Sequence, residues 1–293
     1  MEIESLLLAQ GGLATTAELL TVTTRKRLAG LIKAGRLFRV CHGVYAVDEP
    51  DVVGKLAALD LLAAHPIVAC MGTAAALYGF DTENTSRVHV LDPGVRMRPS
   101  RNLMVHQRIG APLRRVEGRL ATAPAWTVIE VARTLHRPRA LATLDAALHV
   151  GACTTGELHA ATREQRGRRG IIKVRELINC ADGRAESPME SEARLVFLDA
   201  RLPMPELQYS IVDRYGRVWR ADFAWPEACL AAEYDSIEWH AGRERMLRDR
   251  LKMARLQECG FTIISMTVDD IRRDPVGLTD RIGYHLNRHR LAS

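Results

Sequence analysis

Three acidic residues in the last third of the sequence have the types and spacing that metal-assisted phosphodiester chemistry uses. Asp222 lies in Arg217–Trp225, and Glu233 and Asp235 lie in Cys229–Asp235. Alternate residues of a strand share one face, about 7 Å apart, so neighbouring strands would gather all three carboxylates on one patch. A hard divalent cation with oxygen ligands relieves the mutual repulsion of such a patch. The spacing therefore predicts a Mg²⁺ site, with unrelated surface acids as the alternative that spacing alone leaves open.

The elements that must position these carboxylates can be predicted from the surrounding pattern. Asp222 alternates with the apolar residues Trp219, Ala221, Phe223 and Trp225, which we expect to form a buried face behind it. Ser187-Pro188 is typical of a helix start, and that helix carries Glu190. The full predicted order is helix, three strands, helix, strand, helix. In the fifth element we expect Leu247, Leu251 and Ala254 to face the core and Lys252 to lie on another face.

Residues 1–50 are predicted to form three helices and a hairpin. Thr15 and Glu18 form a capping-box pattern, and Gly35 and Gly43 are typical of a helix end and a turn. No acidic residue occurs between Leu19 and Val47. Clustering of this kind favours contact with a phosphate backbone, although a solvated helix face is the alternative. The expected DNA-binding residues are Arg25, Lys26, Arg27, Lys33, Arg36 and Arg39.

Bulk composition narrows the class of protein. The net charge is only +6, and the six cysteines are scattered without a C-x-x-C pair, which argues against a zinc ribbon and a disulfide scaffold. The N-terminus lacks the basic start of a signal peptide, and no apolar stretch reaches the roughly 18–20 residues of a membrane span. We therefore expect a cytoplasmic protein without membrane contact.

Length predicts two domains or three small ones, and the mixture of predicted helices and strands makes this an α+β multidomain chain. The expected parts are a winged helix at 1–50, an α/β middle domain at 51–160, a linker at 161–185 and a nuclease-like domain at 186–293. The Arg- and Gly-rich linker could contact nucleic acid or simply be solvated. His89 and His106 are expected to be structural, since the middle segment shows no catalytic constellation.

The C-terminal segment resembles the endonuclease-like proteins related to very-short-patch repair endonucleases, within the PD-(D/E)XK fold. The motifs that carry the resemblance are Ser187-Pro188-x-Glu190, Ala221-Asp222-Phe223-x-Trp225, Ala232-Glu233-Tyr234-Asp235 and Glu238-Trp239-His240. The resemblance implies that Asp222 and Glu233 hold Mg²⁺ or another divalent cation, that Glu190 assists, and that His240 is a general acid or base. Asp235 stands where the usual lysine would be, and Lys252 is a candidate to supply that charge.

The N-terminal half resembles AbiEi-type (abortive infection, type IV) antitoxins. The winged-helix pattern is Gly12-Leu13-x-Thr15, Gly35-Arg36-Leu37 and Arg39-Val40-x-x-Gly43-Val44-Tyr45, and Ala140–Leu148 resembles the domain that follows it. The chain departs from that family at Trp126 and Glu130. The resemblance implies DNA as a partner and a cognate toxin protein as a further candidate partner.

Two functions follow from these resemblances. The first is a metal-dependent DNA endonuclease or nickase, targeted by the winged helix, in which Glu190, Asp222, Glu233, Asp235 and His240 form the catalytic site. The second is an antitoxin-like transcriptional regulator whose nuclease fold is catalytically inactive. Retained acidic residues at every motif position favour the enzyme slightly, and RNA is a weaker alternative substrate, since a fold does not fix its substrate.

Overall fold

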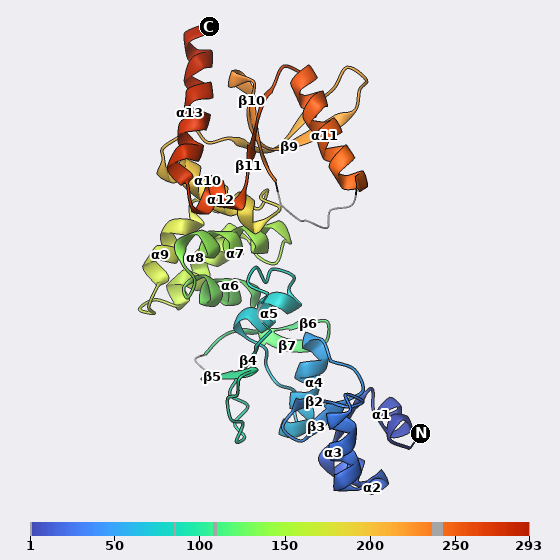
Figure 1. Ribbon diagram of the computed structural model, residues 1–293. Helices are drawn as coiled ribbons and strands as arrows, with labels where there is room; N and C mark the ends of the chain where they lie inside the picture. The colour runs from blue at the N-terminus through green and yellow to red at the C-terminus, as the bar shows by residue number, and fades with distance from the viewer. Residues whose placement is uncertain (1, 85, 108–109, 236–242, 293) are drawn as a thin grey trace. The chain divides into compact units, whose positions relative to one another are not determined.

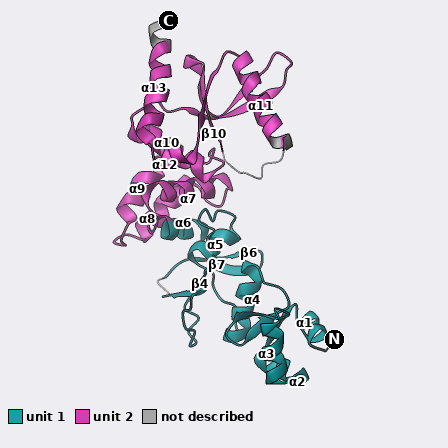
Figure 2. Cartoon of the chain, viewed as in Figure 1, with its two compact units in different colours: residues 1–131 teal, residues 132–293 magenta. Residues whose placement is uncertain are grey.

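The computed structural model describes residues 2–84, 86–107, 110–235 and 243–292. The chain divides into two compact units, residues 1–131 and 132–293 (Figure 2). Both units mix helices with small sheets, which agrees with the expected α+β class (Figure 1). Within the described ranges, no helix is both long enough and apolar enough to cross a membrane.

The first unit begins with a three-helix and three-strand arrangement. Its elements are α1 (Glu2–Ala9), β1 (Leu13–Thr15), α2 (Thr16–Val22), α3 (Arg25–Lys33), β2 (Phe38–Cys41) and β3 (Val44–Ala46). The predicted capping box is present, because Thr15 caps α2 and the Glu18 side chain accepts from the Thr15 amide at 2.7 Å. Gly43 turns β2 into β3 with a φ of +82°, which favours glycine. The strand β1 was not expected, and it pairs with β3.

The rest of the first unit packs small sheets against two helices. Its elements are α4 (Val52–Ala63), α5 (Met71–Leu77), β4 (Val88–Leu91), β5 (Leu103–His106), β6 (Leu113–Val116) and β7 (Arg119–Thr122), followed by α6 (Pro124–Ala132). β4 and β5 are parallel, whereas β6 and β7 form an antiparallel pair. His89 Nδ1 and His106 Nε2 lie 2.9 Å apart across β4 and β5, so the two rings hydrogen-bond to each other.

The second unit starts with a helical layer that runs from the end of the expected middle domain through the expected linker. Its helices are α7 (Arg137–His149), α8 (Thr155–Glu164), α9 (Ile171–Ile178) and α10 (Pro188–Asp199). The expected linker at 161–185 is wrong as an exposed connection, because α9 buries Ile171, Val174 and Leu177 at helical spacing. In the Arg- and Gly-rich turn between α8 and α9, Arg166, Gly167 and Arg169 are exposed, as the composition suggested.

A four-stranded sheet and three further helices form the remainder of the second unit. Its elements are β8 (Glu206–Val212), β9 (Val218–Trp225), β10 (Leu230–Tyr234), α11 (Arg243–Glu258), β11 (Thr262–Met266), α12 (Val268–Arg272) and α13 (Pro275–Ala292). The strand order is β11-β10-β9-β8, and only β10 and β11 are parallel. Helices α10 and α13 share a buried core with one side of the sheet, and α11 packs on it through Leu256 (Figure 1). The observed order matches the prediction, except that the last helix is two helices.

The apolar residues of β9 serve two cores rather than one face. Phe223 and Trp225 pack in the α10 and α13 core, while Trp219 and Ala221 pack with Leu256 of α11. All four residues are buried, as expected, but they pack in two cores and not in one. Asp222 lies where β9 changes from one core to the other.

Candidate functional site

Asp222 and Glu233 are brought together by the pairing of β9 with β10. Phe223 lies opposite Ala232 in this antiparallel pair. The Tyr234 amide, next to Glu233, donates to Asp222 Oδ2 at 2.9 Å. Lys252 of α11 completes the group, because its Nζ donates to Glu233 Oε2 at 2.5 Å. The two predicted carboxylates thus meet one lysine.

Burial shapes the electrostatics of this group. Burial raises the pKa of Glu233 to about 7, and the neighbouring charge of Asp222 adds to the rise, while Lys252 opposes it. Burial also raises the pKa of Asp222, against the lowering effects of the Tyr234 amide and Lys252. Glu233 Oε1 is buried and has no hydrogen-bond partner among the described residues. The group therefore contains one buried acceptor, Glu233 Oε1, without a donor among the described residues. It also contains two carboxyls close enough that the charge of one raises the pKa of the other.

The position of α11 explains why Lys252 reaches the carboxylates. Leu256 is fully buried, and Lys252 lies one helical turn before it, on the same side of the helix. The predicted core face of α11 is wrong, since Leu247 and Leu251 are 54% and 39% exposed. Among the described side chains of α11, Leu256 alone is buried and anchors the helix to the sheet, which places Lys252 over the sheet. Most of the other apolar residues of α11 face solvent.

Glu190 is buried beside Asp222 but is engaged by its own surroundings. Its Oε2 accepts from the Glu186 amide at 3.0 Å and from Gln208 Nε2 at 2.8 Å. Burial raises its pKa, and the charge of Asp222 contributes to the rise. Gln208, which no sequence pattern indicated, lies in β8 between the residues that pair with the two neighbours of Asp222. Its φ of +51° is unusual for a strand and has no signal in the sequence.

The other predicted site residues have separate outcomes. Asp235 follows β10 and is exposed, and its amide donates to Met266 O at 2.8 Å. Its side chain is exposed, unlike those of Asp222 and Glu233, and its catalytic role stays a prediction. His240 lies outside the described residues. Across the described ranges, no group of three or more His, Cys, Asp or Glu could hold a metal ion. Of the three carboxylates that spacing predicted to converge, the structure brings Asp222 and Glu233 together.

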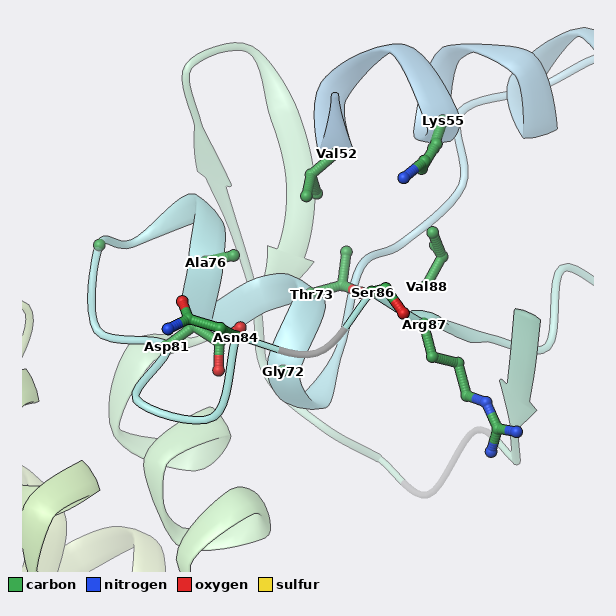
Figure 3. Close-up of a pocket in the computed structure, with 11 residues that line it drawn as sticks. Val52, Lys55, Gly72, Thr73, Ala76, Asp81, Asn84, Ser86, Arg87 and Val88 are labelled. Carbon is green, nitrogen blue, oxygen red and sulfur yellow. The ribbon is translucent and has the colours of Figure 1, made fainter. Parts of the chain in front are cut away.

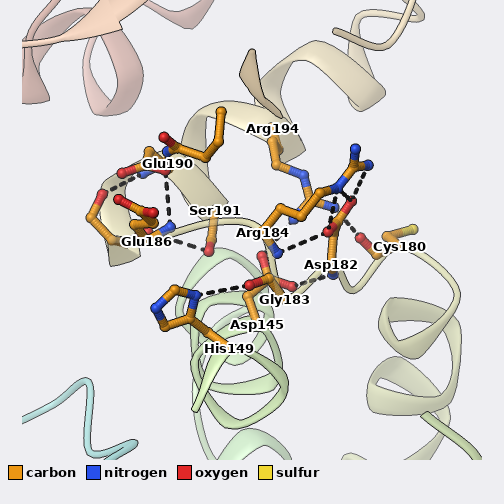
Figure 4. A network of polar contacts seen from close by, with 12 residues as sticks. Asp145, His149, Cys180, Asp182, Gly183, Arg184, Glu186, Glu190, Ser191 and Arg194 are labelled. Atoms are coloured by element: carbon orange, nitrogen blue, oxygen red, sulfur yellow. Dashed lines mark hydrogen bonds and ion pairs between the residues drawn. The ribbon is translucent and has the colours of Figure 1, made fainter. Parts of the chain in front are cut away.

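A buried ionic network joins α7 to α10, the helix that carries Glu190. Arg194 Nη1 donates to Asp145 Oδ2 at 2.6 Å, and both side chains are almost fully buried. Asp145 Oδ1 also accepts from the Asp182 amide at 2.8 Å, and the second Arg194 nitrogen donates to Cys180 O (Figure 4). Glu192, on the same helix, is bound by Arg139 and Arg272. The network fixes α10 to the helical layer of this unit.

All six predicted DNA-binding residues are exposed on α3, the turn after it and β2. One of them is partly neutralised, because Arg36 pairs with Glu4 at 3.0 Å. The others form no ion pair with a residue that the structure describes. The surface therefore presents a cluster of exposed cationic side chains, and their contact with DNA stays a prediction.

A cavity of about 400 Å³ lies in the first unit between α4, α5 and β4 (Figure 3). Gly72, Thr73 and Ala76 give it a floor of small side chains. Lys55 lies on one side of the cavity and Asp81 and Asn84 on the other (Figure 3). The lining is a mixed polar rim and not a paired acid and base.

Comparisons with known proteins place the chain in a family. Residues 67–180 match the family model described as the AbiEi antitoxin C-terminal domain. The matched region includes α9 and ends inside the predicted linker at 161–185. The uncharacterized proteins MT2308 and Rv2248, from two strains of Mycobacterium tuberculosis, are each 63% identical over 269 residues, which is 92% of this chain and 99% of the relative. The chain therefore belongs to the same family as these mycobacterial proteins, and it contains a region similar to the AbiEi antitoxin C-terminal domain.

Proposed function

We propose that the protein is a DNA-binding, antitoxin-like regulator that contacts DNA through α3 and β2. The observation that carries this proposal is the exposed set of basic side chains in a stretch without acidic residues, in a chain that also contains the AbiEi-type region. Cationic side chains that replace condensed counterions on DNA supply affinity at any sequence. The same family supports a cognate toxin protein as partner, which co-purification with the product of a neighbouring gene would test.

The double variant Arg25→Ala/Arg27→Ala is expected to weaken DNA binding at every sequence tested. Loss of two phosphate contacts should make the slope of log affinity against log salt shallower by about 2. Gel shifts on the protein's own promoter, over a salt series, measure both quantities. The matched control is Arg96→Ala/Arg98→Ala, which removes the same charge from exposed positions of the same unit. Equal slopes for the two double variants would contradict the proposal.

A second candidate function, metal-dependent nuclease or nickase chemistry, is favoured by the group of Asp222, Glu233 and Lys252. A bound divalent cation would supply a Lewis acid and an activated water. Asp222 and Glu233 would hold it, and the unpartnered Glu233 Oε1 is an oxygen that such a ligand would satisfy. Lys252 would then be available to contact the phosphate charge, in place of the family's usual lysine, whose position Asp235 occupies.

Asp222→Asn is expected to lower plasmid nicking by at least about a hundredfold, because it removes a charged ligand from the cation. The assay compares purified full-length protein with Mg²⁺, Mn²⁺ or EDTA on supercoiled plasmid. Glu227→Gln is the control, since it removes an exposed carboxylate from the turn between β9 and β10. If wild type, variant and control are equally inert on varied DNA substrates, the catalytic proposal fails and the regulator remains.

A further inference from the structure

The turn between α8 and α9 gathers cationic side chains around two adjacent hollows in the second unit. One hollow of about 540 Å³ is lined by His159, Thr162, Arg163, Arg166 and Arg175. The other, of about 420 Å³, shares Arg166 and Arg175 and adds Arg168 and Arg169. We call residues 163–175 the arginine turn. Its cations come from the end of α8, the connection and the last turn of α9, and the two hollows bring them to one surface.

The charge of the arginine turn is largely uncompensated. Arg163, Arg166, Arg169 and Arg175 are exposed, and none of them forms an ion pair with a residue in the described ranges. Glu164 is the one acidic residue between positions 163 and 175 of the sequence. Exposed arginines that are held near one another without counter-charges repel, and an anion relieves that repulsion.

The arginine turn is also held in a defined shape. Gly167 and Gly170 both have φ of +85°, and a side chain at Gly170 would overlap the Arg133 carbonyl oxygen. The Lys173 ammonium donates to Leu135 O, which ties the start of α9 to the same segment. Gly170 is the N-cap of α9 and offers no capping side chain. The positive end of the helix dipole therefore adds to the arginines.

We propose that the arginine turn is a second nucleic-acid contact, which takes the phosphodiester backbone of DNA. Two hollows that share Arg166 and Arg175 suit a run of successive phosphates, whereas one free phosphate would occupy only one of them. Apart from the imidazole of His159, the lining contains no aromatic ring for base stacking, so the contact reads mainly charge and not sequence. The site belongs to the second unit and is distinct from the basic residues of α3 and β2. It rests on the proposed function only in that DNA is the partner.

The test compares salt dependence of DNA binding by the full chain in EDTA, where cutting plays no part. Arg166→Ala/Arg175→Ala should make the slope of log affinity against log salt shallower by about 2 and should lower affinity roughly tenfold or more near physiological salt. The control, Arg201→Ala/Arg273→Ala, removes the same charge from exposed positions of the same unit. Both variants change exposed side chains, and unaltered thermal unfolding would verify their folding.

The outcomes separate this inference from the proposed function. If wild type binds DNA and the two double variants show the same slope, the proposed DNA contact at the arginine turn is wrong, and the proposed regulator function is unaffected. If wild type binds no DNA, both fail. A further arm adds inorganic phosphate at millimolar concentration and follows the unfolding temperature. Phosphate stabilisation that is lost in Arg166→Ala/Arg175→Ala, with an unchanged DNA slope, would overturn the nucleic-acid assignment in favour of a free-anion site.

Discussion

Arg194→Ala is expected to destabilise the second unit by about 3–5 kcal/mol, because it leaves the Asp145 carboxylate buried without its cation. Arg194 also donates to Cys180 O, so the variant orphans a second acceptor. Burial already raises the pKa of Asp145 to about 6 despite the arginine. Without the arginine this pKa should rise further, and the carboxyl should protonate on folding. Urea unfolding at pH 7 measures the change in the free energy of unfolding.

Arg137→Ala is the matched control, since Arg137 joins the same two helices through Asp199. That pair is exposed, at 45% and 51% of the two side chains, so its loss should cost about 1 kcal/mol or less. Replacing both buried partners with apolar residues, as in Asp145→Leu/Arg194→Met, should recover much of the stability. Equal costs for Arg194→Ala and Arg137→Ala would show that the buried pair is not what fixes α10 to α7.

Local signals in the sequence predicted the elements whose ends depend on neighbouring residues. Thr15 and Glu18 satisfy the first amides of α2, and Ser187 accepts from the Glu190 amide at the start of α10. Gly35 and Gly43, at the predicted helix end and turn, have positive φ, where glycine has no steric cost. These caps and turns depend only on residues a few positions apart, so the local sequence is enough to predict them.

Features that depend on distant partners were not predictable. The arginines and glycines at 165–170 suggested a linker, yet they connect two helices whose buried faces pack in the same unit. Helix α11 has apolar residues on several sides, and only its contact with β9 determines that Leu256 is buried while Leu247 is exposed. Composition describes how much apolar surface a helix has, and tertiary packing decides which part is covered.

The candidate site shows the same division. Strand alternation placed Glu233 correctly beside Asp222, because pairing of β9 with β10 needs only a short connection. Gln208 could not be predicted, since its contact with Glu190 spans the interface between a helix and a sheet edge. Lys252 was a candidate from its place in the following helix, and the structure gives it Glu233 as its partner.

Glu233→Gln is expected to stabilise the protein above neutral pH, by up to about 3 kcal/mol near pH 8. In the wild-type protein, burial is the main cause that raises the pKa of Glu233 from 4.5 to about 7 in the folded state. A carboxyl with a raised folded pKa contributes stability that is fully present below about 4.5 and is lost as the pH rises through about 7. Glutamine keeps the shape of the protonated acid and does not titrate, so this loss should vanish in the variant.

The measurement is the difference in the free energy of unfolding between Glu233→Gln and wild type from pH 5 to pH 8, which should grow by up to about 1.4 kcal/mol per pH unit. Taking the difference removes the contribution of Asp145, whose raised pKa of about 6 falls in the same window in both proteins. Glu227→Gln should show no such growth, since that carboxylate is exposed. Parallel stability curves for wild type and Glu233→Gln would contradict the raised pKa. A growing difference would mean that the chain keeps a buried, charged Glu233 at a cost in stability, which is expected of a carboxylate retained for binding or chemistry.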